Sequence, residues 1–286
     1  MWIIFAFLSA VFAGATAVLS KVGITNINSN LGTAIRTVVV FIFACLMVFV
    51  VGAQDEVSQI NARTYTFLIL SGLSTGVSWL CYFKALKEGS VNKVAPIDKS
   101  STIITMVIAF IFLHEELTLL KVICIALIAA GTYLMIEKQE EKERTIGKSS
   151  WLVPAVLSAV FAALTSILGK IGISDINSNL GTAIRTFVVL IMAWLVAFTT
   201  KSVKGAKKIS LKDFMFLILS GVTTGLSWLC YYRALQDGPA SVVVPIDKLS
   251  ILITIGFSYI VLKERLTKKS LCGLILLVSG TLLLLL

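Results

Sequence analysis

Charged residues are scarce in this chain, and their scarcity excludes a soluble fold. Only 14% of the 286 residues are Asp, Glu, Lys or Arg, whereas 57% are hydrophobic and the mean hydropathy is +0.96. Soluble domains usually carry about 25% charged and about 45–50% apolar residues. The composition therefore predicts an integral membrane protein.

Sequence signals of metal, disulfide and nucleotide chemistry are also missing. The chain has one His, no HExxH sequence, no CxxC pair among its five Cys, and no GxxxxGK[ST] loop for ATP phosphates. The first apolar stretch lacks a basic leader and an A-x-A cleavage site, so no removable signal peptide is expected. We therefore expect no cofactor, no metal and no catalytic residues, and we do not interpret the protein as an enzyme.

Cations outnumber anions, with a formal net charge of +10, yet they do not indicate a nucleic-acid partner. The Lys and Arg residues stand in short segments between long apolar runs. That pattern is typical of anchoring at a membrane surface, so membrane lipids rather than nucleic acid are the expected partners.

The chain consists of two copies of one sequence. Residues 2–137 return at 151–286 with a constant offset of 149, and roughly half of the aligned positions are identical. GITNINSNLGTAIRT, SWLCY and VAPIDKSS in the first copy become GISDINSNLGTAIRT, SWLCY and VVPIDKLS in the second. We expect a first repeat at 1–137, a charged linker at 138–150 and a second repeat at 151–286.

Each copy is expected to hold five membrane-spanning helices, because a span takes roughly 20 apolar residues and lipid admits only helices or closed barrels. The expected spans are 2–22, 31–52, 65–86, 91–113 and 118–137, then 151–171, 180–200, 214–235, 240–262 and 268–286. Since five is odd, the second copy enters the membrane upside down. The predicted fold is an all-α integral membrane protein with ten transmembrane helices in two inverted five-helix repeats (5+5).

Loop charges predict the orientation. The loop at 53–63 has one cation, Arg63, whereas the equivalent loop at 202–212 holds several lysines. Cations in short loops favour the cytoplasmic side, so equivalent loops of opposite bias support inversion. The same rule places both termini outside.

Ionisable residues within the expected spans are candidate substrate-binding or gating groups. Each copy supplies a Lys, an Arg and an Asp-Lys pair; these are Lys21, Arg36, Asp98 and Lys99, then Lys170, Arg185, Asp247 and Lys248. Asp98 and Asp247 would each lie roughly 10 Å below their own surface. Alternatives remain open: snorkelling for the Lys and Arg residues near helix ends, and an Arg36–Asp98 ion pair that serves packing only. Pro96 and Pro245 either lie in a first helical turn or interrupt the helix near the aspartate.

The third expected span of each copy adds aromatic and small residues. Trp79 with Tyr82, and Trp228 with Tyr231, share a helix face and belong either to an interfacial belt or to a cavity wall. The Gly and Ser residues beside them favour close helix contact. The LHEELT and LKERLT segments read as turns, where we expect Glu115 and Glu264 to stabilise the turn and Thr118 and Thr267 to cap the next helix.

At these residues the chain resembles the EamA domain of the drug/metabolite transporter (DMT) superfamily. The resemblance rests on the basic residue that closes the first helix, the TAIRT arginine, PIDKxS and the ERLT-like turn. It implies a central cavity built mainly from helices 1–4 and 6–9, with helices 5 and 10 peripheral, and solute transport by alternating access. Such relatives are usually drawn with both termini in the cytoplasm, so the loop charges depart from the pattern here.

The sequence thus predicts a secondary active transporter of a small polar or zwitterionic metabolite in the bacterial plasma membrane. Export is slightly favoured by the resemblance, and protons are the candidate coupling ion through Asp98 and Asp247. The alternatives are a flippase for a lipid-linked substrate and, with least support, an intramembrane enzyme. Both a monomer and a homodimer are compatible with the sequence.

Overall fold

The structure, a computed structural model, describes residues 1–23, 27–88, 94, 97–135, 151–203, 209–261 and 267–286. In this part of the chain every regular element is helical. The first repeat forms α1 (Trp2–Gly23), α2 (Ser29–Val50), the 3₁₀ helix η1 (Ala53–Gln59), α3 (Ala62–Glu88), α5 (Ser101–Phe112) and α6 (Leu119–Leu134). The second forms α7 (Leu152–Gly172), α8 (Ser178–Thr199), α9 (Leu211–Asp237), α10 (Ala240–Lys248), α11 (Ser250–Val261) and α12 (Lys268–Leu283).

Seven helical segments in the described ranges are long and apolar enough to cross a membrane. They are Trp2–Ser20, Ser29–Val50, Ala62–Ala85, Leu152–Gly172, Ser178–Thr199, Leu211–Asp237 and Ala240–Phe257. The expectation of an all-helical fold is confirmed for the described residues, and these candidate spans support a multi-pass membrane protein. The expected linker at 138–150 lies outside the described residues.

Asparagine and threonine side chains define where several helices begin. Asn28 accepts a hydrogen bond from the backbone N of Asn30 at 3.0 Å, and Asn177 does the same for Asn179 at 2.9 Å. Such caps satisfy amides that the first helical turn leaves unpaired. The repeated NSN sequence thus sets the start of α2 and α8. Thr118 and Thr267 cap α6 and α12 as expected.

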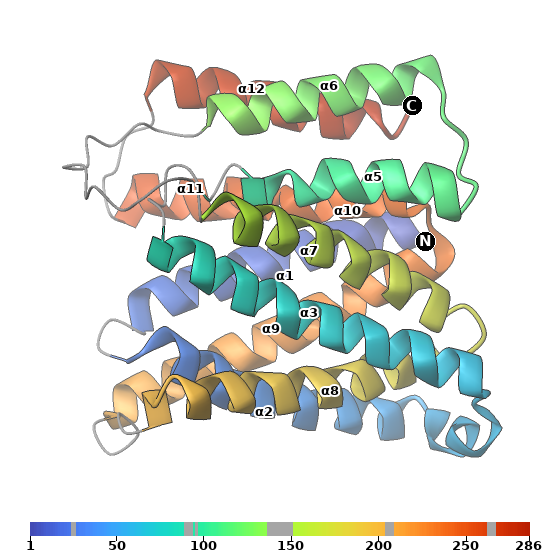
Figure 1. Cartoon of the computed structure of the whole chain (residues 1–286), viewed down its shortest axis with the longest axis vertical. Helices are drawn as coiled ribbons and strands as arrows, with labels where there is room; N and C mark the ends of the chain where they lie inside the picture. Colours follow the sequence, from blue (N-terminus) through green and yellow to red (C-terminus); the bar gives the residue numbers. More distant parts are fainter. Residues whose placement is uncertain (24–26, 89–93, 95–96, 136–150, 204–208, 262–266) are drawn as a thin grey trace.

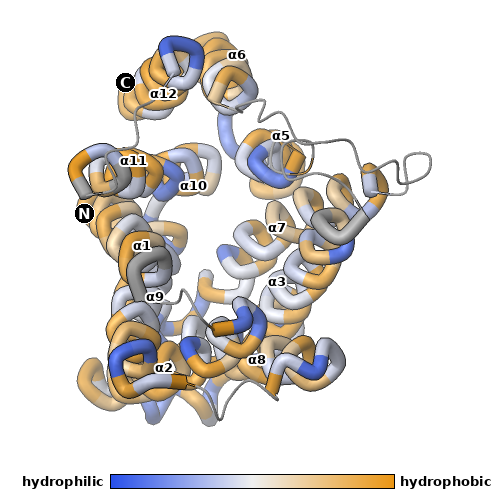
Figure 2. The backbone as a smooth tube through the Cα atoms, turned by 90° about the vertical axis from the view of Figure 1, so that its left-hand side faces the viewer, coloured by the Kyte–Doolittle hydropathy of each residue, from blue (hydrophilic) through white to orange (hydrophobic). Residues whose placement is uncertain are grey.

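The two repeats interlock rather than lie side by side. α1 packs against α9, α10 and α11 of the second repeat, and α7 packs against α3 and α5 of the first. α2 contacts α8, while α6 and α12 pair as an outer layer (Figures 1 and 2). α1 and α7 run in opposite directions, and both chain ends lie at the same end of the bundle (Figure 1). We call this the terminal end.

Glycines allow the cross-repeat contacts to be close, as the sequence predicted. A methyl group added at Gly72 of α3 would lie 2.9 Å from the carbonyl oxygen of Arg185 in α8, and one at Gly221 would lie 3.1 Å from that of Arg36. The two contacts are equivalent between the repeats. Small residues therefore bring α3 onto α8 and α9 onto α2 with backbone almost touching backbone.

The helix predicted at 240–262 is not continuous. It is divided into α10 and α11 at Leu249, directly after Asp247 and Lys248. Pro245 lies inside α10 and has no N–H, so it cannot donate to the carbonyl of Ser241. The predicted span is thus helical on both sides of a one-residue break, and Pro245 lies inside α10 rather than in its first turn.

Candidate functional site

A cavity of about 300 Å³ lies where the two repeats meet. It is lined by polar and aromatic side chains of α1, α3, α7, α8, α9 and α10; the lining residues are Ala13, Thr75, Ser78, Trp79, Ala162, Thr165, Ser166, Arg185, Ser227, Trp228, Tyr231, Tyr232, Asp247 and Lys248. Contributions from both repeats make it a site at the repeat interface, where solute sites of inverted-repeat proteins are typically found.

Asp247 is held by a serine of the other repeat. Ser9 of α1 donates a hydrogen bond from Oγ to Asp247 Oδ1 at 2.6 Å, and its Oγ lies 3.4 Å from that of Ser227 in α9. Ser227 in turn donates to the backbone carbonyl of Ser9 at 3.2 Å. The carboxylate is therefore fixed to the crossing of α1 and α9.

The first repeat contains the same arrangement around Asp98. Ser158 of α7 donates to Asp98 Oδ1 at 2.9 Å, and Ser78 of α3 donates to the Ser158 carbonyl at 3.0 Å. Ser9, Ser78 and Asp98 correspond to Ser158, Ser227 and Asp247 through the repeat. Each aspartate is thus bound by the first helix of the opposite repeat, a feature that neither copy reveals alone.

The Asp-Lys pairs of the two repeats lie near each other. Lys99 interacts electrostatically with Lys248, Asp98 and Asp247, so the Asp-Lys pairs of both repeats belong to one cluster. The side chain of Lys99 is exposed and those of Asp98, Asp247 and Lys248 are half-buried. The formal charges of the four groups balance.

Arg185 is enclosed and has no acidic partner within the described residues. Its side chain is 2% exposed; Nη2 donates to Thr75 Oγ1 at 2.9 Å and Nε donates to Ser71 Oγ at 3.4 Å. The guanidinium lies over the rings of Trp228 and Tyr232, at 5.0 and 4.5 Å from the ring centroids. Cation–π contacts and hydroxyl acceptors stabilise the charge without neutralising it. The cavity beside it therefore offers a place for an anionic group.

Arg36, the equivalent of Arg185, has different surroundings. It donates through Nη1 to Ser20 Oγ at 3.0 Å and to Ser220 Oγ at 3.4 Å. The repeat replaces Ser20 by Gly169, and a methyl group at Gly169 would lie 2.6 Å from the ring of Tyr232. Glycine there gives Tyr232 room to cover Arg185, so the two arginines are not equivalent in structure.

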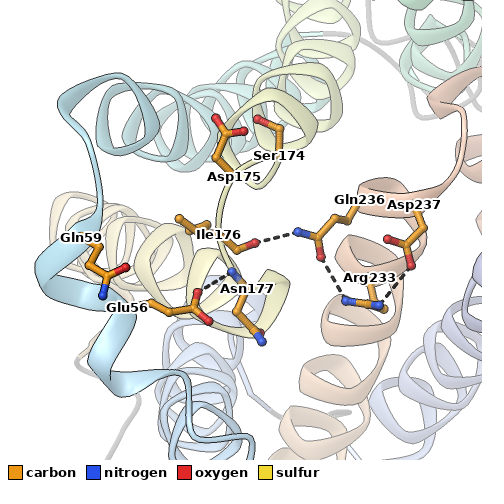
Figure 3. A pocket seen from close by; sticks show the side chains of 9 residues that line it. All are labelled: Glu56, Gln59, Ser174, Asp175, Ile176, Asn177, Arg233, Gln236 and Asp237. Atoms are coloured by element: carbon orange, nitrogen blue, oxygen red, sulfur yellow. Dashed lines mark hydrogen bonds and ion pairs between the residues drawn. The ribbon is translucent and has the colours of Figure 1, made fainter.

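A larger pocket of about 770 Å³ lies at the terminal end (Figure 3). Its polar groups mostly bond to one another: Gln236 donates to the Ile176 carbonyl at 2.7 Å, Asn177 N donates to Glu56 at 2.8 Å, and Arg233 pairs with Asp237 at 3.2 Å (Figure 3). We assign the candidate site to the smaller cavity because it holds the enclosed cation, the aspartate and the aromatic rings.

Six of the twelve predicted site residues line that cavity; they are Trp79, Arg185, Trp228, Tyr231, Asp247 and Lys248. Asp98 and Lys99 join through the charge cluster. Arg36, Tyr82 and Lys170 do not line the cavity: Arg36 bonds to serines and Lys170 is at the terminal end. Tyr82 packs near Ala85 and Ala155 and interacts electrostatically with Asp98. The side chain of Lys21 lies outside the described residues.

Two alternatives from the sequence are wrong. Arg36 and Asp98 form no ion pair in the described part of the chain, since each bonds to serines instead. Arg185 does not snorkel to a membrane surface, because its side chain is enclosed. Lys170, near the end of α7, donates to the carbonyls of Leu235 and Gly238. Sequence reasoning also missed Ser9, Ser158, Thr75 and Tyr232, although the identity of Ser9 and Ser158 between copies was a usable signal.

Comparison with known proteins agrees with this architecture. The family model described as the EamA-like transporter family matches residues 1–137 and again 149–286. A Sinorhizobium sp. protein described as an uncharacterized transporter in the cobO 3' region is 46% identical over 134 residues, which cover 47% of this chain and 95% of the relative. An uncharacterized transporter of Archaeoglobus fulgidus is 25% identical over 229 residues, which cover 79% of this chain and 78% of the relative.

One crystal structure matches 98% of this chain and 95% of its own length, with a TM-score of 0.74 and 12% sequence identity. At that identity the match shows a shared fold only. The family model, in contrast, accounts for both copies of the repeat. The chain therefore belongs to the EamA-like transporter family and is a multi-pass membrane transporter of the DMT superfamily.

Proposed function

We propose that the protein is a secondary active transporter of a small zwitterionic solute, with two inverted repeats of five spans at 1–137 and 151–286. The observation that carries the proposal is one cavity with an enclosed, acid-free guanidinium and a reachable carboxylate, Arg185 and Asp247. An anionic group of the solute would bind Arg185, and a cationic group would bind Asp247 in competition with Ser9.

The size of the cavity supports a small solute. About 300 Å³ is at the lower limit of common ligand pockets, which span about 300–1,000 Å³. Trp228 and Tyr231 supply flat apolar surface for the rest of the solute. A lipid-linked substrate, the alternative from the sequence, would need more room at the interface than this cavity provides.

In the proposed cycle the half-buried aspartates also exchange protons. Asp98 and Asp247 belong to different repeats, yet both contact the first helix of the opposite one. A proton or a solute cation on either carboxylate would weaken the charge-assisted hydrogen bond that holds that helix. Alternating access across the bacterial plasma membrane, with export favoured, then couples solute and proton in opposite directions.

Purified protein in proteoliposomes tests the proposal. Radiolabelled small zwitterions are first screened by thermal shift, because a bound ligand stabilises the folded state; counterflow and uptake driven by a pH gradient follow for each hit. We expect Arg185→Gln to lower affinity about tenfold or more, and Arg63→Gln, a surface arginine near Phe67, to leave it unchanged.

Asp247→Asn tests whether transport is coupled to protons. We expect this variant to lose accumulation under a pH gradient and to retain counterflow at a reduced rate, since exchange needs no net proton movement. Equal accumulation by Asp247→Asn and the unaltered protein would contradict proton coupling. Movement of a labelled lipid with no movement of any zwitterion would replace the proposal by the flippase alternative.

A further inference from the structure

Glu115 of the first repeat contacts the start of a helix in the second. It lies between α5 and α6, and its Oε1 and Oε2 accept hydrogen bonds from the backbone N of Ala240 at 2.6 Å and of Ser241 at 3.0 Å. We expected Glu115 to stabilise its own turn, and that expectation was wrong. It instead caps α10, 125 residues further along the chain.

Lys170 completes the contact from a third element. Its Nζ lies 4.0 Å from Glu115 Oε1 and donates to the carbonyls of Leu235 at 3.0 Å and of Gly238. The Glu115 and Lys170 side chains are 10% and 20% exposed. One carboxylate and one ammonium thus join the α5–α6 connection, the end of α7 and the corner between α9 and α10.

The partners belong to or adjoin α7, α9 and α10, which line the cavity. α10 is only nine residues long, and it carries Asp247 and Lys248 at its other end. α7 contributes Ala162, Thr165 and Ser166 to the same lining. A group that fixes where α10 begins therefore also fixes where Asp247 and Lys248 lie.

Electrostatics makes this contact strong and reversible. The first amides of a helix carry partial positive charge and lack partners within the helix, so a carboxylate on two of them is favourable. Little water reaches Glu115, and its hydrogen bonds are therefore weakly screened. Its neighbour Glu116 has the same charge, but its described contact is the backbone carbonyl that accepts from Lys121 Nζ at 2.8 Å.

We propose that Glu115 and Lys170 are a latch that holds the terminal end of the transporter closed, and that Glu115 positions α10 for the site. In alternating access, opening this end requires the first-repeat loop to leave the α9–α10 corner, which breaks the Glu115 contacts. The inference rests on the proposed alternating access. Its test requires no knowledge of the solute, because the experiment measures access to the cavity rather than transport.

Thiol labelling in vesicles measures the opening. A cysteine-free variant carries Ala162→Cys in the cavity wall and a protease-cleavable tag at the N-terminus, so that cleavage by external protease marks molecules whose terminal end faces the reagent. A charged, membrane-impermeant thiosulfonate is the probe. Glu115→Gln is the test variant and Glu116→Gln its matched control.

We expect Glu115→Gln to label at least about tenfold faster in the cleaved population, since loss of charge-assisted hydrogen bonds shifts an equilibrium by about that factor. Glu116→Gln should label at the unaltered rate. Lys170→Met should also accelerate labelling, and Glu115→Asp, which keeps the charge but shortens the reach, should fall between.

Unchanged labelling in folded Glu115→Gln and Lys170→Met would overturn the latch. Equal acceleration by Glu116→Gln would also overturn it, because the effect would then come from loop charge. If Glu115→Gln does not fold, the comparison of Glu115→Asp with the unaltered protein decides, and equal rates contradict the proposal. Failure to find a transported solute would contradict the proposed function and leave this labelling result standing.

Discussion

At the scale of single residues, hydroxyl groups carry much of the contact between the repeats. Ser9 and Ser158 each bind the aspartate of the opposite repeat, and Thr16 donates to Thr223 at 2.9 Å across the same interface. The sequence indicated the charged members of the site because charge in a membrane span is rare and expensive. It did not indicate the serines, since Ser and Thr also occur in membrane helices as backbone-bonded residues.

Arg185 is a second case in which the sequence alone did not indicate the role of a residue. Its identity with Arg36 between the copies predicted equal roles, yet only Arg185 is covered by two aromatic rings. The difference comes from Tyr232 and Gly169, which the first repeat replaces by Phe83 and Ser20. Because this difference depends on residues that contact Arg185 only in the folded protein, it could not be predicted from the repeat alone.

The closest backbone approach in the outer helix pair gives a stability prediction. A methyl group at Gly131 of α6 would lie 2.5 Å from the backbone N of Leu277 in α12. We expect Gly131→Ala to separate the two helices and to lower the free energy of unfolding by about 1–3 kcal/mol.

Gly256 provides the matched control. A methyl group at Gly256 of α11 would meet no atom of the described residues within 4 Å. Gly256→Ala should therefore keep or slightly raise the melting temperature through better helix propensity. Thermal unfolding in one detergent compares the two variants. A Gly131→Ala protein as stable as the unaltered one would show that α6 and α12 can move apart at no cost.

At the scale of elements, the interruption between α10 and α11 is the main departure from the predicted helices. Hydropathy reports length and apolarity, and 240–262 satisfies both. Only Pro245 signals a break, and proline is also compatible with a first turn. In the structure it follows Pro239, the N-cap of α10, by six positions and precedes the break at Leu249 by four. The sequence therefore left open whether Pro245 begins a helix or lies within one, and the structure places it inside α10.

Pro245→Ala tests the importance of the interruption. Alanine restores a donor for the Ser241 carbonyl and should lengthen α10 toward α11. We expect equal or greater thermal stability together with a slower counterflow rate for any solute that binds, because Asp247 and Lys248 lose their place at a helix end. Counterflow at the unaltered rate in a folded Pro245→Ala protein would show that the break is dispensable.

At the scale of the whole molecule, the internal repeat predicted the arrangement of the helices better than any local sequence pattern did. The opposite directions of α1 and α7, the shared end of both termini and the paired contacts are what inversion requires (Figure 1). The sequence could not predict that the repeats exchange their first helices. The first helices of the two copies carry similar apolar and small residues, so either one could pack against the third helix of either repeat.

The proposed orientation, with both termini outside, is tested by thiol labelling of intact cells. Ser58→Cys in η1 and Lys212→Cys at the start of α9 place single exposed cysteines at opposite ends of the bundle in a cysteine-free background. From the loop charges we expect an impermeant reagent to label the first without lysis and the second only after it. The reverse pattern would mean that the chain departs from the positive-inside rule.

The exchange of first helices has a consequence for biosynthesis. α1 is synthesised about 200 residues before its partners α9 and α10, and until they follow it Ser9 lacks its partners Ser227 and Asp247. The first repeat must therefore wait in the bilayer, half assembled, for the second to arrive.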